Sequence, residues 1–187
     1  MCELCDRQLL QTGLDRRRFL AAGVGLAAAG LGLPRPAEAR RARTLSFHHT
    51  HTGERLRVTF AEDGEFVPEA LAEVSHLLRD FRTGDSVAID PELLTLLHRL
   101  RERAGGQGTY EIISAYRSPR TNDMLRERGG AVAQRSLHMD GRAIDVRLRG
   151  VPTRELRKIA LDLQAGGVGY YARSDFLHVD TGRVRSW

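Results

Sequence analysis

The alternation of apolar and polar residues along the chain predicts a mixture of strands and helices. Two short apolar runs flank Thr52-Gly53 within residues 45–60, which indicates a β-hairpin. Apolar residues at helical spacing then predict a helix from Pro68 to about Phe81. A second helix is predicted to begin at Pro91, with Asp90 as its N-cap, and to end near residue 104.

The second half of the chain continues this mixture. Strands are predicted over residues 110–116 and 142–148, with a short helix between them that begins after Ser118. A helix over 153–164 and a final hairpin over 167–180 complete the chain. Because strands and helices alternate without regular strand–helix–strand units, we expect an α+β fold with a small antiparallel sheet flanked by helices.

The N-terminal 39 residues have the pattern of an export signal. Arg16, Arg17 and Arg18 precede Phe19-Leu20 and a Gly/Ala-rich apolar run, and Ala37-Glu38-Ala39 resembles a cleavage site. Paired arginines followed by x-Phe-Leu are typical of a twin-arginine signal. The apolar run, about 14 residues, is shorter than the roughly 20 needed to span a bilayer.

We therefore predict that residues 1–39 are removed on export and that residues 40–187 form a single periplasmic domain without stable membrane insertion. Cys2 and Cys5 both lie in the leader, so the mature chain can form no disulfide. The whole chain has a net charge of +5, a mild excess that would suit an acidic polymer as partner. The chain has no basic aromatic stripe, and nucleic acid is not an expected partner.

Three polar residues are candidate ligands of one metal ion. His138 precedes Gly141, where the chain can turn sharply. Asp145 lies on one face of its predicted strand, and His178 lies on one face of the last strand. If those strands are neighbours, the three side chains can converge as two imidazoles and one carboxylate, a typical catalytic zinc set. The alternative is that the histidines are hydrogen-bonded structural residues and Asp145 is an edge charge.

Hydrolysis at such a centre also needs a carboxylate to move the proton of the attacking water. Asp175 lies three residues before His178 and points away from it on an ideal strand, so it can act only if the chain bends there. Asp180 shares a face with His178 and is either the rival base or an anchor for a ligand imidazole.

A second histidine cluster lies in the first hairpin. In an alternating strand His49 and His51 share a face and could hold a metal ion weakly. The alternative is an exposed hairpin without a ligand.

Three segments, SAYRSPRTNDMLR, SLHMDGRAIDVRL and GGVGYYARSDFLHVDTG, resemble a group of zinc peptidases. The group includes D-Ala-D-Ala carboxypeptidases, vancomycin-resistance dipeptidases and the hedgehog signalling domain. Its S-x-H-x-x-G-x-A-x-D signature is filled by Ser136, His138, Gly141, Ala143 and Asp145. Within the group, the chain is most similar to the murein endopeptidase K-like peptidases, over roughly residues 44–187.

The resemblance implies a hedgehog/D-Ala-D-Ala-peptidase-like fold and one Zn²⁺ held by His138, Asp145 and His178. It also implies that Arg117 lies beside the metal and stabilises the oxyanion, a role suited to a side chain that stays charged. Many relatives have glutamate where this chain has Asp175, whose reach is shorter. With this resemblance we favour Asp175 over Asp180 as the base.

The function implied is that of a zinc metallopeptidase, a murein D,D- or L,D-endopeptidase that hydrolyses the peptide cross-links of peptidoglycan. One alternative is a D,D- or L,D-carboxypeptidase that trims stem peptides. Another is a non-catalytic, zinc-containing cell-wall binding module. Structural zinc sites usually have four protein ligands, and the three evident here favour catalysis.

Overall fold

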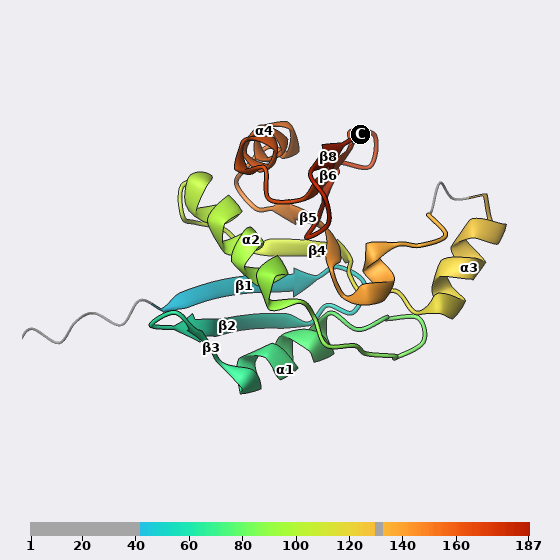
Figure 1. Ribbon diagram of the computed structural model, residues 1–187, viewed down its shortest axis with the longest axis horizontal. Helices are drawn as coiled ribbons and strands as arrows, with labels where there is room; N and C mark the ends of the chain where they lie inside the picture. Colours follow the sequence, from blue (N-terminus) through green and yellow to red (C-terminus); the bar gives the residue numbers. More distant parts are fainter. Residues whose placement is uncertain (1–41, 130–132) are drawn as a thin grey trace, which may run out of the picture. The chain divides into compact units, whose positions relative to one another are not determined.

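The computed structural model describes residues 42–129 and 133–187, and the predicted leader lies outside the described residues. The described residues form an eight-stranded sheet with the order β3-β2-β1-β4-β5-β7-β6-β8 (Figure 1). The strands are β1 (Arg43–His49), β2 (Arg55–Glu62), β3 (Glu65–Phe66), β4 (Tyr110–Ser114), β5 (Ala143–Leu148), β6 (Gly167–Tyr171), β7 (Phe176–Asp180) and β8 (Arg185–Ser186). The helices are α1 (Pro68–Leu77), α2 (Pro91–Arg103), α3 (Pro119–Glu127), the 3₁₀ helix η1 (Leu137–Asp140) and α4 (Thr153–Leu163).

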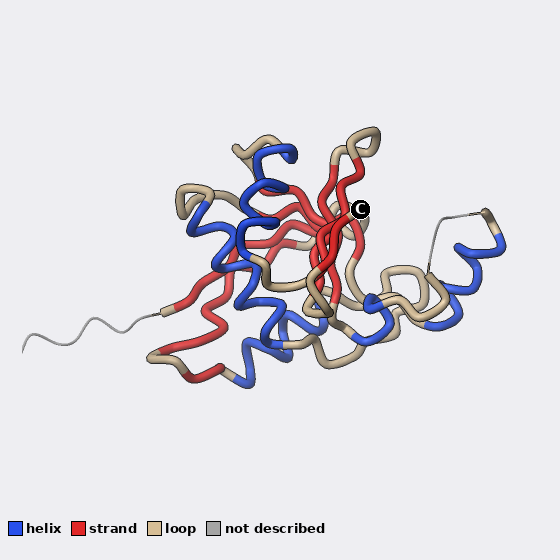
Figure 2. Tube along the Cα trace, turned by 45° about the horizontal axis from the view of Figure 1, so that its top comes forward, coloured by secondary structure: helices blue, strands red, loops and turns tan. Residues whose placement is uncertain are grey.

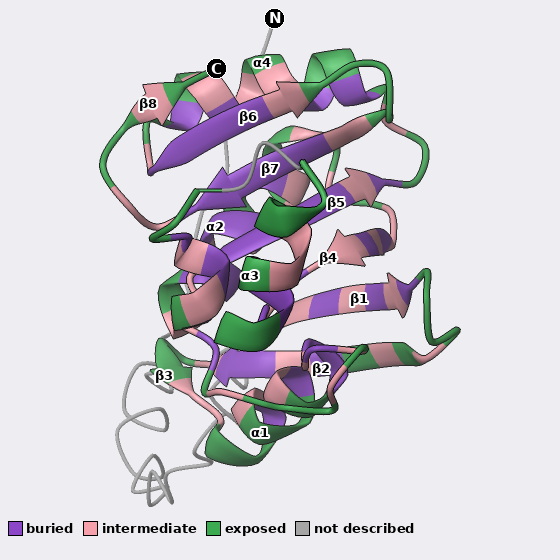
Figure 3. Cartoon of the chain, turned by 90° about the vertical axis from the view of Figure 1, so that its right-hand side faces the viewer, coloured by how far each residue is buried: buried purple, intermediate pink, exposed green. Residues whose placement is uncertain are grey.

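Helices α2 and α4 cover one face of the sheet and enclose most of the core. The α2 face predicted to be apolar is buried, and α4 contacts β5, β6 and β7. In Figure 3, α4 lies behind β6 while α3 lies in front of the sheet. Figure 2 shows the same separation of α3 from α2 and α4. The sheet face that carries Asp145 and His178 is therefore not the one packed against α2 and α4.

The helix boundaries follow local capping. The Asp90 side chain accepts a hydrogen bond from the backbone N–H of Glu92, which confirms the predicted N-cap of α2. The Ser118 side chain caps α3 in the same way through the N–H of Thr121. Helix α1 ends at Leu77, before the predicted Phe81, and the following turn folds over Asp80.

The predicted α+β class is confirmed, but the sheet is larger than expected and mixed. The β1–β2 and β6–β7 pairs are the two predicted hairpins. The β1–β4 and β6–β8 pairs are parallel. Helices α1 and α2 lie between β1 and β4 in the chain, and such a long connection lets a strand return in parallel.

Among the described residues, no helix is both long and apolar enough to cross a bilayer.

Candidate metal centre and cleft

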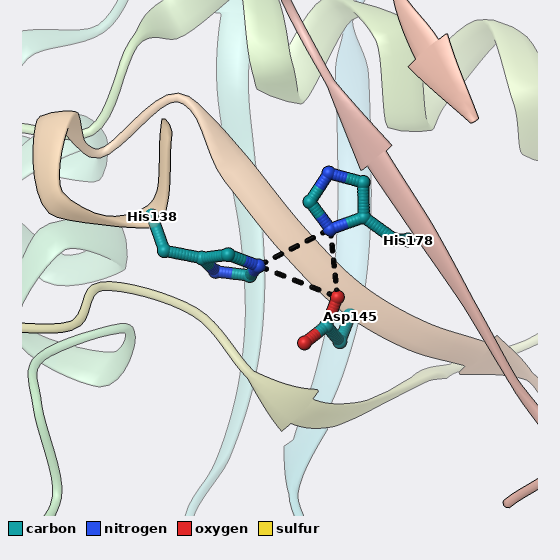
Figure 4. Close-up of side chains that lie close together, drawn as sticks. All are labelled: His138, Asp145 and His178. Carbon is teal, nitrogen blue, oxygen red and sulfur yellow. Dashed lines mark hydrogen bonds and ion pairs between the residues drawn. The ribbon is translucent and has the colours of Figure 1, made fainter. Parts of the chain in front are cut away.

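Three elements bring His138, Asp145 and His178 together (Figure 4). Strands β5 and β7 are antiparallel neighbours, and Asp145 lies directly opposite His178 in their register. His138 comes from η1, which ends at Gly141 with a left-handed φ of 67°. A Cβ atom at Gly141 would lie 2.7 Å from the carbonyl oxygen of Ala88. The glycine therefore permits both the turn and its close packing.

The three donor atoms form a compact triangle that fits a tetrahedral ion. The distance from Nε2 of His138 is 3.2 Å to Nδ1 of His178 and 3.4 Å to Oδ1 of Asp145. The third edge, from Nδ1 of His178 to Oδ1 of Asp145, is 2.9 Å. Donors bound tetrahedrally to zinc at its usual distances lie about 3.3 Å apart. The triangle is close to one face of such a site.

The hydrogen bonds of the two imidazoles turn their lone pairs toward the same point. Nδ1–H of His138 donates to the carbonyl oxygen of Ala115 at 2.7 Å, which leaves Nε2 as a lone pair in the neutral ring. Nε2–H of His178 donates to Oδ2 of Asp180 at 2.9 Å, which leaves Nδ1 as a lone pair. Both lone pairs face the Asp145 carboxylate, and all three side chains are buried. A cation is the group that fits such a cluster of acceptors.

The pKa values of the site reflect the same geometry. Burial raises the pKa of Asp145, but the adjacent His138 and His178 outweigh burial and hold that pKa well below its usual range. Burial lowers the pKa of His178, whereas hydrogen bonds to Asp145 and Asp180 raise it further than burial lowers it. The carboxylate is thus the form of Asp145 present in the folded protein.

Arg117 lies beside this group, as the family resemblance implies. One of its terminal nitrogens is 4.0 Å from Oδ2 of Asp145, and its Nε is buried without a hydrogen-bond partner among the described residues. Its backbone N–H donates to the carbonyl oxygen of His138, while His138 bonds back to Ala115. These hydrogen bonds therefore fix the Arg117 segment and the candidate ligand His138 to each other.

Asp80 holds the same segment from the other side, a contact that the sequence analysis missed. Its Oδ2 accepts hydrogen bonds from the backbone N–H and the hydroxyl of Ser118, at 2.9 and 2.7 Å. Burial raises the pKa of Asp80, but hydrogen bonds from Thr121 and Ser118 hold it below its ordinary value. The buried carboxylate thereby fixes the residue next to Arg117.

The structure separates the two candidate bases. Asp180 is fully buried, and its two oxygens accept bonds from His178, from the backbone N–H groups of Gly167 and Gly182, and from both terminal nitrogens of Arg185. A carboxylate with so many donors has no lone pair left for water, and this geometry fits an anchor for His178.

Asp175 lies elsewhere. Its left-handed φ of 49° supplies the bend that the sequence analysis required. Its side chain is exposed and lies 3.8 Å from Nε of Arg147, in a depression that also contains Glu111. Among the described residues, the lining of the metal-side cleft includes Asp145 and no other carboxylate. The role of Asp175 as base stays a prediction.

The histidine cluster of the first hairpin differs from the exposed arrangement considered above. His49 is fully buried, and its Nδ1 accepts weak hydrogen bonds from the backbone N–H groups of His51 and Thr52. The ring of His51 stacks on Phe81 at a centroid distance of 4.2 Å. Burial lowers the pKa of His49 to about 4. This imidazole therefore stabilises the hairpin turn.

A cleft of about 380 Å³ opens beside the candidate metal ligands. Its lining consists of Arg117, Ala133, Arg135, Ser136, Leu137, His138, Asp145, Tyr171, Phe176, His178, Arg185 and Trp187. Three of these residues, Arg135, Arg185 and Trp187, were not predicted from the sequence to lie at the site. The signal in the sequence was the spacing of Gly167 and Gly169, which leaves one face of β6 without side chains up to Tyr171.

Two imidazoles and one carboxylate at the edge of an open, basic cleft define the class of site that mononuclear metallohydrolases use. The chain belongs to the peptidoglycan L,D-endopeptidase MepK family, whose model matches residues 37–187.

The relatives support this assignment along most of the chain. The peptidoglycan L,D-endopeptidase MepK of Escherichia coli (strain K12) is 41% identical over 177 residues, covering 92% of this chain and 97% of that protein. The probable peptidoglycan L,D-endopeptidase MepK of Haemophilus influenzae is 41% identical over 146 residues, covering 78% of each chain. The comparison with solved structures gave no match.

Proposed function

We propose that this chain is a zinc-dependent peptidoglycan L,D-endopeptidase that hydrolyses peptide cross-links. The observation that carries the proposal is the convergence of the lone pairs of His138 and His178 on the Asp145 carboxylate at the edge of a basic cleft. Membership of the MepK family supplies the substrate class.

In this proposal His138, Asp145 and His178 hold one zinc ion. A zinc ion bound there would polarise the scissile carbonyl and lower the pKa of water. The Arg117 guanidinium stabilises the negative charge that develops on the carbonyl oxygen, and Asp80 and Ser118 keep it in place.

The protein also controls the tautomers of the two imidazoles. The carbonyl of Ala115 fixes the proton of His138 on Nδ1, and Asp180 fixes that of His178 on Nε2. Asp175 is kept as the proposed base, because Asp180 is saturated with donors. For that role, the turn between β6 and β7 must bring the Asp175 carboxylate from Arg147 to the cleft.

The deciding experiment uses purified cross-linked muropeptide dimers. The mature protein, residues 40–187, is incubated with 3,3-linked (L,D) and 4,3-linked (D,D) dimers, with zinc or with chelator. We expect zinc-dependent conversion of the 3,3-linked dimer to monomers, identified by mass. Shortened monomers would instead support the carboxypeptidase alternative. Binding without cleavage of any dimer or monomer would support a cell-wall binding module.

We also propose that residues 1–39 direct the chain to the periplasm through twin-arginine export. The support is the pair Arg16-Arg17 before the apolar run. Replacing both arginines with lysine should leave the protein in the cytoplasmic fraction, whereas an equal periplasmic amount would contradict this route.

A further inference from the structure

Two glycines leave part of one face of β6 without side chains, beside the candidate metal centre. Gly167 and Gly169 lie two residues apart, so their missing side chains would share one face. A Cβ atom at Gly169 would lie 2.7 Å from the indole ring of Trp187, and one at Gly167 would collide with Arg185 and Asp180. The glycines therefore make room for the C-terminal segment to lie against the site.

Trp187 is held against these glycines by hydrogen bonds of its backbone and its ring. Its N–H donates to the carbonyl of Val168, and its carbonyl accepts from the N–H of Tyr170. The indole N–H donates to the hydroxyl of Tyr171 at 3.1 Å, and the ring centroid lies 5.2 Å from that of His178. The indole is thus fixed against a candidate metal ligand.

Trp187 nevertheless remains 50% exposed as a residue and lines the cleft. Tyr171, which also lines the cleft, stacks on Phe176 at a centroid distance of 4.5 Å. Among the described residues, the large hydrophobic side chains that remain exposed are Tyr171, Val184 and Trp187, and two of these three face the cleft. Fixed, exposed apolar surface gathered at a site marks a place where a ligand packs.

The charges of the cleft indicate the rest of the ligand. Arg185 forms two bonds to the Asp180 carboxylate, and Arg117 lies near Asp145. Arg135 is exposed, lines the cleft and has no ion pair or hydrogen bond with the described residues. The cleft therefore presents one cation that no described carboxylate neutralises, together with an aromatic wall.

We propose that Trp187 and Arg135 form a substrate subsite for an aliphatic residue that carries a free carboxylate. The aliphatic chain packs on the indole, and the carboxylate accepts hydrogen bonds from the Arg135 guanidinium. This inference rests on the proposed function: the residue belongs to the peptide on one side of the bond that is cut. It assigns two specificity-determining residues that contact the substrate.

Trp187 is the one tryptophan of the chain, so its fluorescence reports on this subsite alone. The zinc-loaded protein is titrated with a 3,3-linked dimer whose diaminopimelate side-chain carboxylates are free, and with the same dimer carrying carboxamides there. We expect a saturable change in emission, with the carboxamide dimer binding roughly 10-fold more weakly. An unchanged emission during binding or cleavage of the dimer would overturn the assignment of Trp187.

The Arg135→Gln variant should lose most of the preference for the free carboxylate. Arg128→Gln is the matched control, because Arg128 is an exposed arginine outside the cleft lining. A preference equal to that of the wild type in Arg135→Gln would overturn the role of Arg135.

Kinetics with zinc content measured on each sample separate a binding role from damage to His178. Trp187→Leu should raise KM about 10-fold at unchanged zinc content, and Trp187→Phe should restore most of the loss. Val184→Ala, at an exposed apolar residue of the same segment outside the cleft lining, should leave KM unchanged.

An unchanged KM in Trp187→Leu would overturn the subsite. Failure of the proposed function has a different signature, since the dimer would then change Trp187 emission without being cut by the zinc-loaded wild type.

Discussion

Replacing Asp180 with asparagine should cost both metal affinity and stability, for a reason that lies in the tautomer of His178. In the wild type, Oδ1 of Asp180 accepts from the N–H groups of Gly167 and Gly182, and Oδ2 accepts from Nε2–H of His178. The asparagine oxygen must stay with the two glycine donors. Its NH₂ group then faces Nε2–H of His178 and the terminal N–H of Arg185, which are also donors.

His178 can restore a hydrogen bond to this amide only by moving its proton to Nδ1. That nitrogen faces Asp145 at 2.9 Å and is the atom that would bind the metal. In the variant, either the asparagine NH₂ faces Nε2–H of His178 as a second buried donor, or the proton moves to Nδ1 and blocks the nitrogen that would bind the metal. Loss of such an outer partner typically lowers metal affinity 10- to 100-fold, and we expect Asp180→Asn to fall in that range.

The loss of stability follows from the pairing of Asp180 with Arg185. Breaking a fully buried ion pair costs about 3–5 kcal/mol. Because the Arg185 side chain is 31% exposed and can turn partly to water, we expect the lower end, about 3 kcal/mol, or roughly 10 °C in Tm. Urea unfolding of the zinc-free protein measures this without a contribution from the metal.

Asp175→Asn is the matched control, because its carboxylate is 68% exposed and its ion pair with Arg147 is worth at most about 1 kcal/mol. It should bind zinc like the wild type, and if Asp175 is the base it should lose 10²- to 10⁴-fold in kcat. Wild-type zinc affinity and stability in Asp180→Asn, together with a large loss of kcat, would refute the tautomer argument and make Asp180 the base.

Three further predictions concern other parts of the molecule. Asp80→Asn should lower kcat about 10-fold with zinc affinity unchanged, because it loosens the Ser118 contact that fixes Arg117; loss of zinc at the same time would show a wider structural effect. His49 has a folded pKa of about 4, below its unfolded value near 6.5, so it contributes stability above pH 6.5 that is lost as the pH falls toward 4. Asn in place of His49 should remove up to ~3 kcal/mol of that pH dependence, measured as the difference from the wild type in urea unfolding at pH 7 and pH 4.5. Saturation of the site with zinc at about 100-fold above its Kd should raise Tm by roughly 5–10 °C, and the same rise in a His138→Ala variant would place the ion elsewhere.

The sequence predicted those features of the site that depend on local pattern. The alternation of residues in β5 and β7 assigned Asp145 and His178 to strand faces, and Gly141 indicated the turn that follows His138. The face of α2 and its Asp90 cap were equally local and were predicted correctly. Each of these signals lies within one turn of helix or one stretch of strand.

What the sequence could not predict depends on contacts between distant residues. Asp80 meets Ser118 across 38 positions, and an aspartate in a polar turn gives no sign that it is buried. The two residues of β8 are too few to show the alternation of a strand, so the packing of Trp187 on Gly169 could not be predicted. The parallel pairing of β1 with β4 depends on how the long connection between them, which contains α1 and α2, packs on the sheet.

The hydrogen bonds around the candidate ligands divide the site into two halves that meet at Asp145. On one side, Ala115 and the backbone of Arg117 fix His138, so the residue proposed to bind the oxyanion and one ligand form a unit. On the other side, Asp180 fixes His178 and is itself held by the segment that ends in Trp187. Changes at Arg185 can therefore reach the metal through Asp180 and His178, whereas Asp80 holds Ser118 and contacts no candidate ligand. Zinc affinity should consequently respond to replacement of Arg185 and not to replacement of Asp80, and this asymmetry distinguishes the two halves experimentally.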